Sequence, residues 1–361
     1  MHIPDGYLSP STCAVAFLIA APFWWLAQKR VQRALHTRLV PLLAVVSAFS
    51  FVIMMFNLPL PGGTTGHAVG MGVAAIVLGP WAAILAISVA LFIQAVFFGD
   101  GGITAIGANC LNMAIVGPMV AYGLYRLIAA GSELTSKRRI VAASIAGYCA
   151  INISALLAAA EFGIQPLLFT DAAGTPLYAP YPLSVAVPAM LLGHLTFAGL
   201  AEAVVTGGIV AYLQKANPEL LQFTASPAGQ SAPMRPQGWR PVRRLWLGMA
   251  IVMMLSPLGL LAAGTAWGEW GASDFQDAAA RADITRASGN IAPPEGAPAG
   301  MQRLEALWSA PVPDYAPSFM HNASIGYVLS AVMGSGLILL IFYLLARFMA
   351  PASYRPTSGR R

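Results

Sequence analysis

Long apolar runs separated by short polar segments constrain the fold of this 361-residue chain more than any other feature. A helix needs about 20 apolar residues to cross the roughly 30 Å hydrocarbon core of a bilayer. Only 9% of the residues are charged, whereas soluble domains carry about 25%. We therefore predict an all-α integral membrane protein of about nine transmembrane helices, the third of them short. The predicted spans are 12–28, 39–57, 67–79, 81–98, 108–130, 139–161, 183–213, 243–263 and 323–348.

The basic residues predict the orientation of these spans. Of the 20 Lys and Arg residues, 17 follow the first, fifth, seventh and ninth spans, which end on one side of the membrane. Cytoplasmic loops carry an excess of Lys and Arg, so the N-terminus is expected outside and the C-terminus in the cytoplasm. Short basic clusters between apolar spans are typical of membrane loops and do not indicate nucleic-acid binding.

Two changes in composition divide the chain. Residues 214–242 are rich in Pro, Gln, Ser and Ala, which indicates a cytoplasmic linker. Residues 264–320 form a long polar stretch between the last two spans and are expected outside the cell. The predicted organisation is a seven-helix module over 1–213 and a two-helix module with an external loop over 243–350.

The first two residues form a potential metal chelate. The α-amine of Met1, the amide nitrogen of His2 and the His2 imidazole can close two adjoining rings around one ion. A fourth nitrogen would complete the square plane that suits Ni(II) or Cu(II). The segment MHIPDGYLSP lacks the basic start of a signal peptide, so we expect no cleavage and a retained terminus.

His67 is the histidine expected on the same side as Met1 and His2. It opens the third predicted span within GGTTGHAVGMG, where the glycines remove side-chain bulk and would let an inserted N-terminal peptide approach. The alternative is a purely structural histidine at a helix start. Metal binding at such a site would weaken as the histidines become protonated.

A second polar constellation lies in FFGDGGITAIGANCLNMAIVGP, residues 97–118. Asp100 lies in a glycine-rich external loop. Asp100, together with Asn109 and Asn112, which lie three residues apart, could orient metal ligands through hydrogen bonds. The alternative is a capped helix start with ordinary amide bonds between helices. Within the seventh span, His194 and the intramembrane carboxylate Glu202 could serve coupling or contact a partner subunit.

The chain lacks the motifs of an ATPase or of an intramembrane metalloprotease. None of its three lysines lies in a glycine-rich phosphate-binding loop, and no HExxH motif occurs. We therefore expect a transport subunit rather than an enzyme, with any ATP hydrolysis carried out by a separate protein.

Four motifs in order resemble the CbiM/NikM family, the substrate-capturing (S) components of energy-coupling factor (ECF) importers for cobalt and nickel. They cover residues 1–213 and read MHIPDGYLSP, GGTTGHAVG, FFGDGGITAIGANCLNMAIVG and HLTFAGLAEAVVTGGIVAYL. Residues 243–350, with GTAWGEWG at 264–271 and PDY at 313–315, resemble the small NikN/CbiN component fused behind it.

The resemblance implies a seven-helix metal-capturing module in a bacterial cytoplasmic (inner) membrane. It implies an ion held by the Met1 amine, the His2 amide and imidazole, and His67, with no cofactor beyond the transported Ni²⁺ or Co²⁺. It also implies two partners, a CbiQ/NikQ-like coupling subunit in the membrane and a CbiO/NikO-like ATP-binding subunit. The fused architecture and the all-nitrogen plane favour nickel.

Several alternatives remain at this stage. Cobalt, for cobalamin synthesis, could be the main cargo. A proton-coupled secondary carrier would use Glu202 and His194, and an assembly subunit would bind no metal at all. A vitamin-binding component would not need a free Met-His terminus. The external loop could attract divalent cations through its carboxylates or be merely solvated, and a role for His321 in metal entry stays open.

Overall fold

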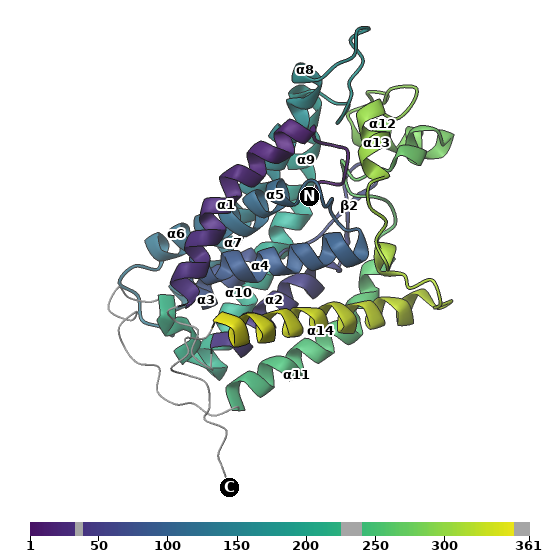
Figure 1. Ribbon diagram of the computed structural model, residues 1–361. Coiled ribbons are helices and arrows are strands. Elements are labelled where there is room, and N and C mark those ends of the chain that lie inside the picture. The colour runs from purple at the N-terminus through teal and green to yellow at the C-terminus, as the bar shows by residue number, and fades with distance from the viewer. Residues whose placement is uncertain (33–38, 225–239, 350–361) are drawn as a thin grey trace.

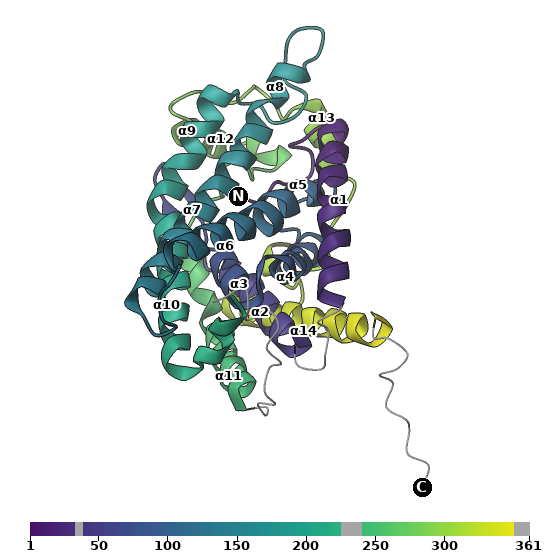
Figure 2. The same ribbon diagram turned by 90° about the vertical axis from the view of Figure 1, so that its left-hand side faces the viewer.

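Seven helices are long and apolar enough to cross a membrane in this computed structural model, which describes residues 1–32, 39–224 and 240–349 (Figures 1 and 2). The central part of the predicted linker, 225–239, therefore lies outside the described residues. Several spans are built from consecutive helical segments. The spanning elements are α1 (Pro10–Gln32), α4 (Pro80–Ile93) with η1 (Gln94–Phe98), α5 (Ile106–Asn109) with η2 (Cys110–Val116) and α6 (Gly117–Ile128), α7 (Lys137–Gly163) with α8 (Gln165–Leu168), α9 (Leu183–Gly193) with η3 (His194–Ala198) and α10 (Gly199–Ala216), α11 (Arg240–Leu255) with η6 (Ser256–Leu261), and α14 (Ala323–Met349).

The remaining elements are short. Two apolar helices complete the first module. The loop over residues 264–320, which keeps the name external loop from its predicted side of the membrane, carries small helices around irregular backbone. They are α2 (Leu39–Met54), α3 (Met71–Leu78), β1 (Leu58–Leu60), β2 (Thr64–Gly66), η4 (Pro218–Thr224), η7 (Ala272–Phe275), α12 (Ala278–Ala287), α13 (Ala299–Glu305) and η8 (Pro313–Tyr315). β1 and β2 pair antiparallel as a hairpin.

The mostly helical membrane fold is confirmed, but the count of nine spans is not. The third predicted span is the eight-residue helix α3, which rises only about 12 Å at 1.5 Å per residue. All of its residues are buried, in contact with α2, α4, α6, α7 and α10. A tight turn at Gly79-Pro80 separates α3 from α4, with Gly79 at a φ of 78° and Pro80 opening α4.

Small residues let the helices of the first module approach closely. α7 and α10 make the most extensive helix contact among the described elements, and a Cβ added to Gly147 would lie 2.6 Å from Oγ1 of Thr206. Close backbone approach of this kind is how helices associate in a bilayer, where apolar surface alone gives little driving force. The outward face of α1 remains exposed at Leu18 and Trp25, as expected for a helix that faces lipid.

The second module packs directly against the first. α14 lies along α2, where a Cβ on Gly334 would meet the Phe51 ring at 2.2 Å. The external loop continues over the hairpin: Thr65 donates its amide hydrogen to the carbonyl oxygen of Thr265 at 3.3 Å and forms an isolated parallel bridge with Ala266. The external loop is therefore folded onto the first module.

Candidate functional site

The N-terminal peptide is inserted into the protein. Met1, His2 and Ile3 are 3%, 1% and 0% exposed, and in both ribbon views the N marker lies among the helices (Figures 1 and 2). Burying a charged amine and an imidazole is costly unless polar partners surround them. The contacts of these residues therefore show what the site is built to hold.

Backbone amides and two side chains of the 97–118 segment form hydrogen bonds to the inserted peptide. Asn109 accepts a hydrogen bond from the Ile3 amide at 2.8 Å and donates one to the Ile3 carbonyl at 3.0 Å. The Gly102 amide donates to the same carbonyl at 2.8 Å. The Asp5 carboxylate accepts from the amides of Ile103 at 3.0 Å and Thr104 at 2.7 Å, and from the Thr104 hydroxyl. The peptide is thus fixed at Ile3 and Asp5, directly after His2.

Glycines provide the space for this insertion, although not the glycines that the sequence suggested. A Cβ on Gly102 would lie 2.4 Å from the amide nitrogen of Asp5. By contrast, Gly66, Gly70 and Gly72 make room for other side chains, including Phe49 beside Gly70. The expectation that glycines around His67 clear the terminal peptide is therefore wrong, because they serve packing of the His67 turn itself.

His2 and His67 face each other inside the protein. Their ring centroids are 5.0 Å apart with a 35° interplanar angle. Nδ1 of His67 lies 3.1 Å from the Ala68 carbonyl oxygen, so a proton on Nδ1 is satisfied there and the Nε2 lone pair is left for a ligand bond. Burial, followed by the neighbouring His2 and the terminal amine, lowers the pKa of His67 well below its usual value. The ring is consequently neutral, as metal coordination requires.

Two carboxylates face the nitrogen donors. Oε1 of Glu269, from the external loop, lies 2.9 Å from the Met1 amine. Oδ1 of Asp100 lies 3.0 Å from Nδ1 of His2, a charge contact that lacks hydrogen-bond alignment. Nε2 of His2 is buried and has no hydrogen-bond partner among the described residues. Burial would raise the pKa of Asp100, but the neighbouring His2 imidazole and the Tyr315 hydroxyl outweigh it, so that this pKa lies well below its usual value.

A polar cavity of about 310 Å³ opens beside these groups. It is lined from the first module by His67 and Asp100 and from the second by Glu269, Asp314 and Tyr315. Tyr315 stacks on Phe98 and donates to Oδ2 of Asp100 at 2.5 Å. The cavity walls thus come from both modules, and three carboxylates face a space next to the histidines.

Glu202 supports the turn that carries His67. Its carboxylate, fully buried on α10, accepts hydrogen bonds from the amides of Val69 and Gly70 at 2.8 Å each and of Gly72 at 3.2 Å. These are orphan amides at the start of α3, where a negative charge is favourable. Glu202 therefore does not lie on a surface for a partner subunit, one of the roles that the sequence left open.

The other predicted residues lie elsewhere. Asn112 donates to Oε2 of Glu161 at 2.7 Å within the helices and does not join Asn109 at the site. Nδ1 of His194 lies 2.8 Å from the carbonyl of Met190, one turn earlier. Over the part of the chain that the structure describes, no three His, Cys, Asp or Glu side chains are arranged to hold a metal ion. The amine and amide nitrogens at the terminus are additional donor types.

Sequence reasoning missed the precise roles of Asp5, Glu269 and Tyr315. Glu269 was one acidic residue among several in the external loop, although its position between two tryptophans in GTAWGEWG was a usable signal. Trp267 and Trp270 are buried, and the Trp270 carbonyl accepts a hydrogen bond from Tyr7 at 2.8 Å. The aromatic residues thus anchor Glu269 against the terminal peptide.

Comparison with known proteins matches both parts of the chain. The CbiM model, described as a cobalt uptake substrate-specific transmembrane region, matches residues 2–220, and the PDGLE domain model matches residues 243–350. The chain is 62% identical over 338 residues to the fused nickel transport protein NikMN of Rhodobacter capsulatus, covering 94% of this chain and 95% of that protein.

A second relative and a solved structure are also similar to this chain. A probable fused nickel transport protein, LarMN, of Lactiplantibacillus plantarum is 43% identical over 96% of this chain and 97% of its own length. A crystal structure of a truncated transition metal transporter superimposes with a TM-score of 0.56 at 54% identity, covering 59% of this chain and 98% of that chain. The predicted resemblance is confirmed. The chain belongs to the CbiM family of substrate-specific transmembrane proteins, with a CbiN-like PDGLE domain following the CbiM region.

Proposed function

We propose that this protein is the substrate-capturing component of an ATP-driven ECF-type importer for Ni²⁺, with Co²⁺ as the alternative cargo. The observation that carries the proposal is the burial of the Met1 amine, His2 and His67 together beside a polar cavity. The similarity of the whole chain to fused nickel transport proteins supports nickel.

The proposed ligands are four nitrogens. The Met1 amine, the His2 amide and Nδ1 of His2 form adjoining five- and six-membered chelate rings, and Nε2 of His67 closes the plane. Nitrogen donors in a square plane suit Ni(II) and Cu(II) better than Zn(II). Asn109 and Asp5 hold the peptide that carries three of the four donors.

Ion capture in this scheme exchanges protons for the metal. The Met1 ammonium leaves Glu269 and loses a proton, Nδ1 of His2 turns from Asp100 to the ion, and the His2 amide is deprotonated. Metal binding releases protons whenever ligands must be deprotonated. The carboxylates of Asp100 and Glu269 remain nearby and balance the charge of the cation, since both line or face the same cavity.

The second module contributes the outer part of the proposed route. Glu269 and Asp314 line the cavity from the 264–320 loop, so this loop would attract the dication and guide it to the nitrogens. We place the N-terminus outside and the C-terminus in the cytoplasm of a bacterial inner membrane. A CbiQ/NikQ-like subunit and a CbiO/NikO-like ATPase would drive the release inward.

Calorimetric titration with Ni(II), Co(II) and Cu(II) tests the ligand assignment. The purified protein should bind one nickel ion, and binding should be lost in His2→Ala and in a variant whose N-terminus is extended by two residues. His321→Ala is the matched control, because its side chain is exposed outside the cavity. Nickel binding that survives His2→Ala would place the ligands elsewhere.

Uptake measurements test the energy source separately. In cells that express the coupling subunit, nickel accumulation should stop when the ATP-binding partner is deleted. Accumulation that persists without this partner would instead support a secondary carrier. The metal that competes best in the same assay identifies the main cargo.

A further inference from the structure

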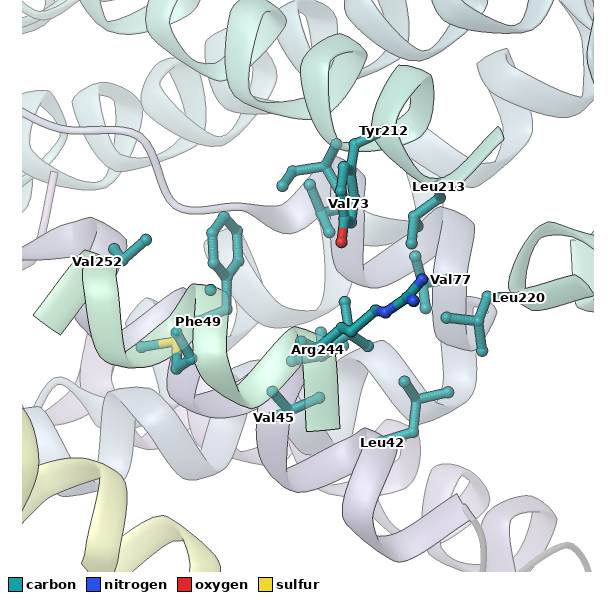
Figure 3. Close-up of a pocket in the computed structure, with 15 residues that line it drawn as sticks. Leu42, Val45, Phe49, Val73, Val77, Tyr212, Leu213, Leu220, Arg244 and Val252 are labelled. Atoms are coloured by element: carbon teal, nitrogen blue, oxygen red, sulfur yellow. The ribbon is translucent and has the colours of Figure 1, made fainter. Parts of the chain in front are cut away.

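An apolar groove, drawn in Figure 3, lies between the two modules and shares no lining residue with the cavity at the histidine site. Its walls come from α2, α3 and α10 of the first module and from α11 of the second, with η4 closing one end. It has a volume of about 180 Å³. The groove is lined by Leu42, Val45, Val46, Phe49, Val73, Val77, Ile209, Tyr212, Leu213, Leu220, Arg244, Leu245, Gly248, Met249 and Val252.

One charged side chain enters this apolar surface. Figure 3 shows Arg244 extended among the aliphatic side chains, with the Tyr212 hydroxyl also turned into the groove. Within residues 1–32, 39–224 and 240–349, neither the Arg244 guanidinium nor the Tyr212 hydroxyl has a hydrogen-bond or ion-pair partner. Both residues are exposed at the mouth of the groove, so an anion bound there can reach their polar groups, and a cation on a membrane-facing surface is stabilised by such a partner.

We propose that the groove binds an anionic phospholipid. One acyl chain lies between α2, α3 and α11, and the phosphate accepts hydrogen bonds from the Arg244 guanidinium and the Tyr212 hydroxyl. Basic pockets between transmembrane helices are known recognition sites for anionic headgroups. The planar guanidinium suits a phosphate because it can donate two parallel hydrogen bonds.

The dimensions and surroundings favour a lipid over a protein segment. A helix with its side chains is about 10–12 Å across, which a cavity of this size does not admit. An extended hydrocarbon chain is much thinner and needs only apolar walls. The groove also lies at the basic end of the helices, near Arg243 at the start of α11 and Lys215 at the end of α10. Charge at this end would add to the attraction for an anionic lipid.

The position of the groove gives the lipid a defined effect. It would fill the space between the two modules, which meet here through α11 and α2. Val73 and Val77 of the groove belong to α3, and α3 begins four residues after His67. A bound lipid would therefore stabilise the seam between the modules and the helix that follows the His67 turn.

Lipid-dependent stability of the full chain tests the proposal. The protein is placed in nanodiscs of phosphatidylcholine alone or in an equimolar mixture with phosphatidylglycerol. The thermal midpoint is measured in both, and retained lipid is identified by native mass spectrometry. Wild-type protein should unfold at a higher temperature in the anionic discs and retain phosphatidylglycerol. Arg244→Gln should lower this retention about tenfold, since a charge-assisted hydrogen bond is lost.

Each variant has a matched control. Arg243→Gln removes a neighbouring charge that does not line the groove, and should keep the preference for phosphatidylglycerol. Gly248→Leu should fill the groove and exclude the lipid while the protein still folds, because a Cβ there meets nothing within 4 Å. Gly336→Leu makes the same change on α14 at another site with free space and should have no effect.

Three results would overturn the proposal. Wild-type protein could lack a preference for phosphatidylglycerol, or Arg244→Gln could keep the same preference as Arg243→Gln. In the third, groove variants would lose the co-expressed coupling subunit without any change in lipid retention, which would identify the groove as a protein contact.

Discussion

The Met1 amine and the Glu269 carboxylate lie 2.9 Å apart, although 268 positions separate them in the chain. The contact joins the N-terminus of the CbiM region to the external loop of the PDGLE domain. The amine is buried and the carboxylate is one-fifth exposed. The fused domain therefore provides a counter-charge that the described residues of the first module do not supply to this amine.

Replacing this carboxylate should lower the stability of the metal-free protein against unfolding. Glu269→Gln leaves the Met1 ammonium buried without its charged partner, at a cost of about 1–3 kcal/mol in the free energy of unfolding. Nickel should still stabilise the variant, because the proposed ion takes the place of the amine proton. The measurement is a thermal unfolding series with and without nickel.

Glu295→Gln provides the comparison for this loss. Glu295 lies in the same external loop, but its side chain is exposed, and surface carboxylates contribute little to stability. Equal stability of the Glu269→Gln variant and the wild-type protein would show that the ion pair with Met1 contributes nothing.

Glu202 fixes the turn after His67 through hydrogen bonds, so replacing it should change the metal affinity although it is not a proposed ligand. The Glu202 carboxylate accepts hydrogen bonds from the backbone amides of Val69, Gly70 and Gly72. In Glu202→Gln, the side-chain NH₂ group is itself a donor and would face these N–H groups. The turn should shift, and nickel affinity should fall about 10–100-fold, as is typical when the groups that orient metal ligands are lost.

Glu161→Gln is the control for this experiment. Glu161 is another carboxylate among the helices, but its partner is Asn112 and not the His67 turn. Titration calorimetry on both variants should show normal nickel affinity for Glu161→Gln only. An equal loss in both would trace the effect to general destabilisation.

Hydropathy located the helices well because length and apolarity alone decide whether a segment can cross a bilayer. It also predicted spans at α2 and α3, which have 16 and eight residues and are not among the seven helices long enough to cross a membrane, since a completely buried helix such as α3 is as apolar as one that faces lipid. The site was predictable in part. The paired positions of Met1, His2 and His67 followed from their expected location on one side, and the structure brings His2 and His67 to 5.0 Å.

Other features depend on contacts that no local pattern records. At the ordinary α-helical period, Asn109 and Asn112 would share a helix face. The π-helix η2 begins between them at Cys110 and rotates the register, so that Asn109 binds Ile3 while Asn112 binds Glu161. The position of Glu269 was also not predictable from the sequence, because the fold of the external loop depends on long-range packing against the first module.

The close approach at Gly102 predicts a loss of metal binding without a change in any ligand. In Gly102→Ala the new methyl group would lie 2.4 Å from the Asp5 amide nitrogen, so the inserted peptide must move. Nickel affinity should fall at least tenfold, as ligands held by strained backbone lose their geometry. Gly123→Ala, on α6 with nothing within 4 Å of the new atom, should bind nickel normally. Normal affinity in Gly102→Ala would mean that the peptide adapts without moving the donors.

The buried, neutral state of His67 predicts how stability depends on pH. Its pKa is lowered in the folded protein, whereas the unfolded value is about 6.5. Above this pH the residue is neutral in both states and contributes no dependence. Below it the unfolded chain binds a proton that the native protein does not, so stability falls by up to about 1.4 kcal/mol per pH unit.

His67→Gln should remove this slope between about pH 6.5 and 5, because glutamine does not titrate in that range. Asp100 does not produce the same signal. Its pKa is lowered in the folded state, so the stability it contributes is complete above about pH 4 and is lost only in stronger acid. Thermal midpoints of the metal-free protein, measured across this window for wild type, His67→Gln and the exposed control His321→Gln, separate the two groups. A slope that persists unchanged in His67→Gln would assign the acid sensitivity to a different residue and would remove the evidence that His67 is held neutral for metal binding.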